Sequence, residues 1–240
     1  MNVRIAYCSN RGGRSHNEDS VRLFQLADAA AVVVADGLGG HGGGDVASAI
    51  AADTMIQLFA SEPTATAEKL RAMFEEANRR ILREQDNFRK MKSTCVTLLL
   101  AGKHAAWGYT GDSRLYHFYE GNLAFQTADH SVSYLAYRSG EIPYAGIRFH
   151  EDRNKVLRAL GNEEDIRPEI AGVELKKGFH AFLLCTDGLW EYVLETEMQA
   201  DLSKAQTPED WISFLVARLS KRVNGKNDNF SAAAVFVAIA

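Results

Sequence analysis

The most constraining feature of the sequence is a pair of short apolar runs, each of which meets an Asp-Gly dipeptide. Residues 30–35 read AAVVVA before Asp36, and residues 181–185 read AFLLC shortly before Asp187. Short apolar runs bounded by turn-forming pairs are typical of strands that are buried on both faces. We therefore expect two interior strands, with both Asp-Gly pairs in turns at their ends.

The rest of the chain supplies further strands and three long helices. Strand-like runs occupy residues 94–101, 105–110, 114–119 and 231–239. Apolar residues at three- and four-residue spacing predict helices over residues 45–60, 66–87 and 208–223, the last with Thr207 as its N-cap and Pro208 in its first turn.

These helices are grouped between runs of strands and do not alternate with them, which disfavours a doubly wound parallel sheet. We predict an α+β protein: a four-layer αββα sandwich of two mainly antiparallel sheets flanked by helices. Residues 1–240 are expected to form one domain. The Gly- and Pro-containing segment at about 131–160 is expected to be an insertion over the rim of the sandwich.

Composition excludes several classes of function. The charge balance, 27 Lys and Arg against 31 Asp and Glu, gives a net charge of −4, and without a basic block a nucleic-acid partner is disfavoured. No apolar run approaches the roughly 18 residues of a membrane span. The polar start of the chain lacks a signal-peptide core and favours a cytoplasmic location. The three cysteines, at positions 8, 95 and 185, form no CxxC pair, so we expect buried free thiols.

Acidic residues recur at comparable positions along the chain: Asp36, Asp112, Asp187 and Asp228 each sit beside a predicted strand, most of them next to glycine or asparagine. Any one of these positions is explained by ordinary turn chemistry. Four together indicate convergence, and sparse carboxylates suit hard cations such as Mg²⁺ or Mn²⁺, which keep several waters, whereas zinc prefers His and Cys.

Two further segments could bind phosphate. Arg14 offers forked donors that can hold a phosphoryl group in two places, although a surface ion pair would also explain it. The glycine-rich run 39–44 has no following Gly-Lys-Ser/Thr, so it is not a nucleotide-binding loop. Its glycines are expected to let the backbone pass close to a metal site, and His41 could bind metal or begin a helix.

Six short motifs occur in order between residues 14 and 231: Arg-x-x-Asn-Glu-Asp, Ala-Asp-Gly-Leu-Gly-Gly-His, Gly-Asp-Ser-Arg, Asp-His-Ser, Thr-Asp-Gly-Leu-Trp and Asp-Asn-Phe-Ser. In this order they resemble the metal-dependent protein phosphatases of the protein phosphatase 2C family, and the short chain is similar to the minimal catalytic domain of bacterial members. The resemblance implies an αββα sandwich with two or three metal ions in a cleft between the sheets.

The resemblance also implies roles for individual residues. Arg14 would receive the substrate phosphate, and residues 131–160 would form a variable flap beside the cleft. The implied metal ligands are Asp36, which bridges two ions, the Gly37 carbonyl, Asp187 and Asp228. Asp19, with Glu18 as a further candidate, would hold metal-bound water, and Asp112 would serve a third, weaker ion.

The implied reaction is direct attack of a metal-bridging hydroxide on phosphorus, without a phosphoenzyme. Leu38 departs from eukaryotic relatives, which have a proposed general-acid histidine there, so the proton donor is open between metal-bound water and a nearby histidine. The adjacent Asp129, His130 and Ser131 are interpreted as structural, since neighbours in sequence rarely form a catalytic triad. Trp107, Trp190 and Trp211 are interpreted as packing residues.

The resemblance favours phosphoserine and phosphothreonine proteins as substrates, including a cognate protein kinase or its targets, and a monomeric enzyme. Two alternatives stay open. The first is a non-catalytic phosphoprotein-binding module on the same fold, against which the retained aspartates argue. The second is a phosphatase of a small phosphorylated metabolite, which the cleft motifs do not exclude.

Overall fold

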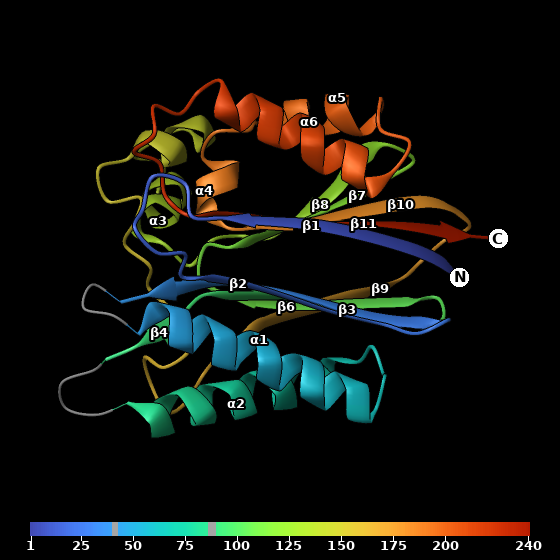
Figure 1. Cartoon of the computed structure of the whole chain (residues 1–240), viewed down its shortest axis with the longest axis horizontal. Coiled ribbons are helices and arrows are strands. Elements are labelled where there is room, and N and C mark those ends of the chain that lie inside the picture. Colours follow the sequence, from blue (N-terminus) through green and yellow to red (C-terminus); the bar gives the residue numbers. More distant parts are fainter. Residues whose placement is uncertain (40–42, 86–89) are drawn as a thin grey trace.

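Two antiparallel sheets packed face to face form the centre of the computed structural model, which describes residues 1–39, 43–85 and 90–240 (Figure 1). The first sheet has the strand order β1 (Asn2–Asn10), β11 (Phe230–Ile239), β10 (Gly178–Cys185), β7 (Arg114–Tyr119) and β8 (Asn122–Gln126). The second has the order β2 (Asp19–Gln25), β3 (Ala29–Leu38), β5 (Cys95–Ala101), β6 (His104–Thr110) and β9 (Glu169–Glu174), and the short β4 (Lys92–Ser93) pairs with β3.

Helices cover the outer face of each sheet. The second sheet is covered by α1 (Gly44–Ser61) and α2 (Ala67–Glu84), and the first by α4 (Asp187–Trp190), α5 (Glu195–Leu202) and α6 (Pro208–Ser220) (Figure 1). The predicted α+β class and αββα layering are therefore confirmed. Among the described residues, no helix combines the length and apolarity that crossing a membrane requires.

The alternation of side chains along β3 explains how one strand serves two cores. Ala31, Val33 and Ala35 pack against the helices, whereas Ala30, Val32 and Val34 pack against the other sheet. Successive side chains of a strand point to opposite faces, so an apolar residue is needed at every position. This is why the run AAVVVA has no polar residue.

The predicted helices are present with small shifts at their ends. The helix predicted over 45–60 spans Gly44–Ser61, and the helix predicted from residue 66 begins after Thr66, whose side chain accepts a hydrogen bond from the Lys69 N–H. Its predicted end falls in 86–89, outside the described residues. Thr207 caps α6 as predicted, with Asp210 completing the capping box.

The expectation of turns at both Asp-Gly pairs was wrong. Asp36 and Gly37 lie inside β3, because β4 pairs with Gly37 and Leu38 and prolongs the ladder. Asp187 and Gly188 begin α4 directly after β10. In both places the carboxylate sits on regular secondary structure, which holds it more rigidly than a turn.

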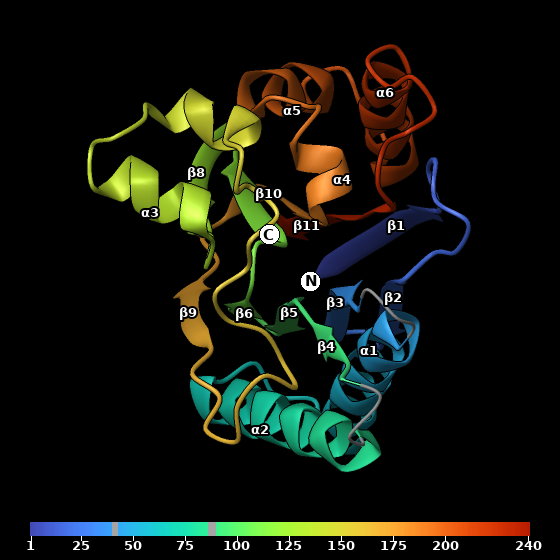
Figure 2. The same ribbon diagram turned by 90° about the vertical axis from the view of Figure 1, so that its left-hand side faces the viewer.

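The remaining sequence expectations concern packing. Trp107, Trp190 and Trp211 are buried, as predicted. Of the cysteines, which are all free, those at 95 and 185 are buried, but Cys8 is only half-buried because it lies on the edge strand β1. The segment 131–160 contains α3 (Val132–Arg138) and a 3-10 helix (Tyr144–Phe149), which stand beside the sandwich (Figure 2).

Candidate metal centre

Two aspartates face each other at one end of the layer between the sheets. Asp36 has the same parity along β3 as Val32 and Val34, so its side chain points toward the other sheet. Asp19, the first residue of β2, is directly opposite Asp36 in the β2–β3 register. Like charges at opposed positions of an antiparallel pair are destabilising, so this pair needs a proton or a cation.

The first sheet contributes Asp187 and Asp228 to the same end. Asp187 follows β10 and Asp228 precedes β11, and these strands are neighbours. The two segments are in close contact, because a Cβ added at Gly188 would lie 1.9 Å from the carbonyl oxygen of Asn229. Glycine at 188 therefore allows the two acidic segments to meet.

Asp112 lies where the chain crosses from one sheet to the other, between β6 and β7. Its carbonyl oxygen accepts a hydrogen bond of 2.9 Å from the Trp190 indole N–H. The neighbouring Ser113 hydroxyl is 2.7 Å from the hydroxyl of Thr94, which also accepts the backbone N–H of Asp36 at 3.1 Å. Thr94 thus links the segments that carry Asp36 and Asp112.

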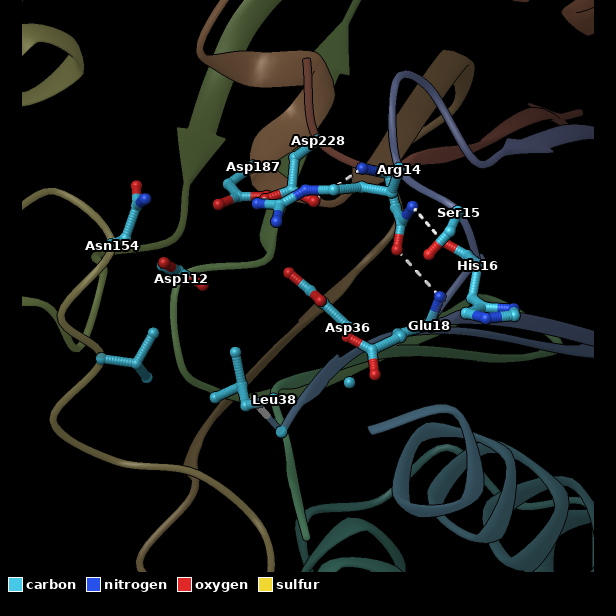
Figure 3. Close-up of a pocket in the computed structure, with 14 residues that line it drawn as sticks. Arg14, Ser15, His16, Glu18, Asp36, Leu38, Asp112, Asn154, Asp187 and Asp228 are labelled. Carbon is cyan, nitrogen blue, oxygen red and sulfur yellow. Dashed lines mark hydrogen bonds and ion pairs between the residues drawn. The ribbon is translucent and has the colours of Figure 1, made fainter. Parts of the chain in front are cut away.

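The segments that carry Asp36, Asp112, Asp187 and Asp228 line a pocket of about 520 Å³. Figure 3 shows Asp36, Asp112, Asp187 and Asp228 directed into it from opposite walls. Of the residues singled out in the sequence, Arg14, Glu18, Asp36, Gly37, Leu38, Asp112, Asp187 and Asp228 line the pocket. Asp19 is not part of the wall and is nearly buried beneath it.

Several lining residues were not anticipated: Ser15, His16, Asn154, Val156 and Asn229. Asn229 belongs to the Asp-Asn-Phe-Ser motif, which contained a signal for it. Ser15 and His16 occupy the two unspecified positions of Arg-x-x-Asn-Glu-Asp, so that motif indicated their segment but not the residues themselves. Asn154 and Val156 come from the segment 131–160, whose sequence gave no sign of which residues face the cleft. His41 lies outside the described residues.

Burial and mutual repulsion raise the pKa of most of these carboxyls. The pKa of Asp36 lies well above its usual range because the group is buried and faces the charges of Asp19 and Asp187. Burial, followed by the charges of Asp112 and Glu191, does the same to Asp187. Burial raises the pKa of Asp19 and that of Asp112 to about 7. A cluster of carboxyls that resist ionisation is typical of a site built for cations.

Two carboxylate oxygens support this interpretation directly. Asp19 Oδ1 and Asp112 Oδ1 are buried and have no hydrogen-bond partner, an arrangement that costs free energy unless a ligand satisfies them. In the described part of the chain, no three His, Cys, Asp or Glu side chains converge tightly enough to chelate one ion. Widely spaced carboxylates still suit Mg²⁺ and Mn²⁺, because these hard cations are held by few carboxylates and keep several water ligands.

Arg14 stands on the rim of the pocket and pairs with Asp228, with 2.7 Å between its Nη2 and the carboxylate Oδ2. Both side chains are substantially exposed, at 59% and 41%. An ion pair of this exposure contributes only about 0–1 kcal/mol. The guanidinium is therefore held near the acidic cluster by a contact that another anion can replace.

Glycine at position 37 is required by the close approach of two chain segments. A Cβ at Gly37 would lie 2.1 Å from the Gly44 carbonyl oxygen, at the start of α1. This contact brings α1 against the strand that carries Asp36. The expectation that the glycine-rich run lets the backbone pass close to the candidate site is confirmed at Gly44; residues 40–42 of that run are outside the described residues.

Comparison with known proteins shows sequence similarity to phosphatases over nearly the whole chain. The sequence model of protein phosphatase 2C matches residues 9–229. The serine/threonine phosphatase stp of Listeria monocytogenes is 33% identical over 228 residues, which cover 91% of this chain and 89% of that protein.

Solved structures agree with this match. The serine/threonine phosphatase PstP/Ppp of Mycobacterium tuberculosis is similar with a TM-score of 0.85 and 29% identity, and 99% of each chain is covered. A structure of the PstP catalytic domain in complex with two manganese ions has a TM-score of 0.84 at the same identity and coverage. With a family match over residues 9–229 and the acidic pocket between two sheets, the chain belongs to the protein phosphatase 2C family.

Proposed function

We propose that this chain is a metal-dependent serine/threonine protein phosphatase that uses two Mn²⁺ or Mg²⁺ ions, with a third, weaker ion at Asp112. One observation carries the proposal: aspartates from both sheets and from the crossing between them enter one pocket that has an arginine on its rim. The family match and the manganese-bound relative support the same activity.

The residues that line the pocket would have different roles in the reaction. Asp36, Asp187, Asp228 and the Gly37 carbonyl would hold the two principal cations, and Asp19 would support them from beneath. Bound cations supply a nucleophile at neutral pH by lowering the pKa of water, and they neutralise charge on the phosphoryl oxygens. Arg14 would leave Asp228 and grip the phosphoryl group through its forked donors.

A proton must reach the departing serine or threonine oxygen. Leu38 lines the pocket but has no proton to give. His16 lines the same pocket from the β1–β2 loop and is exposed to solvent. We assign it as the candidate proton donor, and His16→Gln should lower kcat most for substrates with poor leaving groups, because these depend on protonation.

The substrates are phosphoproteins. We propose that they include a protein kinase or the proteins that it phosphorylates, because a kinase must form the ester that this enzyme cleaves. Both walls of the pocket come from a single chain, which supports a monomeric enzyme; light scattering after gel filtration tests this. A cytoplasmic location accords with such substrates, and cell fractionation tests it. Residues 131–160 would act as the flap, since Asn154 and Val156 reach the pocket.

The decisive experiment measures hydrolysis of p-nitrophenyl phosphate and of a phosphothreonine peptide with Mn²⁺, Mg²⁺ or EDTA. The wild type is compared with Asp36→Asn and Asp187→Asn, which are nearly isosteric. Metal-dependent turnover that both variants lose is the expected result. A folded, metal-loaded wild type that hydrolyses neither substrate would instead support a phosphoprotein-binding module.

A further inference from the structure

The segment 111–113 carries Asp112 into the pocket, but no contact within the segment itself fixes its conformation. It connects a strand of one sheet with a strand of the other, and Gly111 has a φ of +98°, which few side chains tolerate. Asp112 Oδ1 has no partner. Something outside the segment must therefore determine where this carboxylate points.

His130 holds the segment at Gly111 by two hydrogen bonds. The backbone N–H of His130 donates to the Gly111 carbonyl oxygen at 2.9 Å, and the Gly111 N–H donates to His130 Nδ1 at 3.2 Å. The second bond requires an unprotonated Nδ1, so a neutral imidazole carries its proton on Nε2. The histidine is nearly buried and cannot exchange these contacts freely for water.

Contacts on the other side of the imidazole favour the same tautomer, with the proton on Nε2. Nε2 lies 3.0 Å from Glu169 Oε1 on β9, so its proton has a carboxylate acceptor. The Tyr109 hydroxyl donates to the second oxygen of Glu169 at 2.6 Å, and the Tyr109 ring stacks on the imidazole with planes 11° apart. Ring position and tautomer are thus both determined by residues outside the pocket.

The residue before His130 holds the other end of the same segment. The guanidinium of Arg114 forms two hydrogen bonds with the Asp129 carboxylate, at 2.8 and 2.7 Å, and both side chains are buried. The adjacent residues Asp129 and His130 therefore bind the chain on both sides of Asp112, at Arg114 and at Gly111. A shift of either one would move that carboxylate.

We propose that His130 is a positioning residue, which aims Asp112 at the weakest cation through the Gly111 backbone. The inference rests on the proposed function, in which Asp112 holds that ion. Outer contacts of this kind typically change metal affinity by about 10–100-fold when they are removed. The expected effect is a loss of affinity for one ion, with little change in the two that Asp36, Asp187 and Asp228 hold.

Two substitutions of His130 separate this role from general packing. In His130→Asn the side-chain oxygen can take the place of Nδ1 and still accept the Gly111 N–H. In His130→Gln the amide instead reaches the place of Nε2, beside Glu169, and the side-chain bond from the Gly111 N–H is lost, while the backbone bond between the two residues stays in both variants. Asn keeps the Gly111 contact and Gln keeps the Glu169 contact, so weaker ion binding in His130→Gln reports on Gly111.

The experiment titrates the full chain with Mn²⁺ and measures the free ion by electron paramagnetic resonance, with hydrolysis followed in parallel. His130→Gln should weaken the lowest-affinity ion about tenfold and should need correspondingly more Mn²⁺ for full activity. His130→Asn should stay within about threefold of the wild type. Equal Mn²⁺ titrations for the two variants would overturn the proposal.

A third variant covers the case in which His130→Gln does not fold. Glu169 is half-exposed on the edge strand β9, and Glu169→Leu removes the Nε2 acceptor without touching the segment. It should weaken the same ion about threefold, and an unchanged titration would overturn the proposal. If the wild type binds Mn²⁺ but hydrolyses nothing, the proposed phosphatase activity fails, while the ion titrations still decide the role of His130.

Discussion

Removing the carboxylate of Asp129 is expected to destabilise the fold strongly, because it leaves a buried cation behind. Arg114 and Asp129 are each 1% exposed and share two charge-assisted hydrogen bonds. In Asp129→Ala the guanidinium would retain the Trp190 ring, 3.5 Å away, and a longer contact of 3.4 Å to Glu195.

Breaking one side of a buried ion pair costs about 3–5 kcal/mol, and two hydrogen bonds to charged groups, at about 1.5–3 kcal/mol each, sum to a similar figure. For a chain of this size, each kcal/mol lowers the melting temperature by about 2 °C or more. Asp129→Ala should therefore melt at least about 6–10 °C below the wild type. Urea unfolding followed by circular dichroism gives the free energy, and calorimetry gives the melting temperature.

A surface ion pair in the same chain is the matched control. Arg22 Nε and Asp53 Oδ1 are 2.6 Å apart, but the two side chains are 42% and 48% exposed. Asp53→Ala should cost less than about 1 kcal/mol. If Asp129→Ala and Asp53→Ala lost the same free energy of unfolding, burial would not be what makes the first pair important, and the reasoning would be refuted.

Three further predictions concern other parts of the molecule. Thr94→Val removes the hydroxyl that accepts the Asp36 N–H and should cost about 1–3 kcal/mol in urea unfolding, with Thr94→Ser much nearer the wild type; equal losses would contradict this. Gly188→Ala places a methyl group against the Asn229 carbonyl and should lower Mn²⁺-dependent hydrolysis of p-nitrophenyl phosphate by about 100-fold; full activity would show that the two segments can separate without harm. Burial, with a smaller effect from a neighbouring histidine, lowers the pKa of His117 from 6.5 to about 4. The unfolded chain therefore binds a proton between these values that the folded chain does not, and stability should fall by up to about 3 kcal/mol as pH drops from 6.5 to 4. His117→Phe should lack this part of the pH dependence.

Local pattern predicted the elements that are buried on both faces or strongly amphipathic. The run AAVVVA was recognised as a strand because both cores demand apolar residues along β3. The edge strands β1, β2 and β9 were not anticipated. Most of their core-facing side chains are only partly buried, and β9 is largely exposed. These strands therefore carry polar residues that also suit loops.

The residues of the site could be predicted from the sequence, but their contacts could not. Asp36, Asp112, Asp187, Asp228 and Arg14 were all identified in the sequence, and all line one pocket. The order of the motifs could not predict which residues contact one another, such as Arg14 and Asp228. The same holds for the place of Asp19 beneath the pocket wall.

By itself, the sequence determined the alternating apolar faces, the helices and the set of acidic residues available for cations, because these depend on neighbours a few positions apart. The family resemblance added the expectation that these aspartates meet in a cleft between the sheets. Only the tertiary structure decided which contacts position each of them, such as the pairing of Arg14 with Asp228. It also decided that Asp129 and His130 hold the segment carrying Asp112 from both sides. Such contacts depend on strand order and register between segments far apart in the chain, as in the pairing of Asn2 with Ala238, and no local periodicity encodes them.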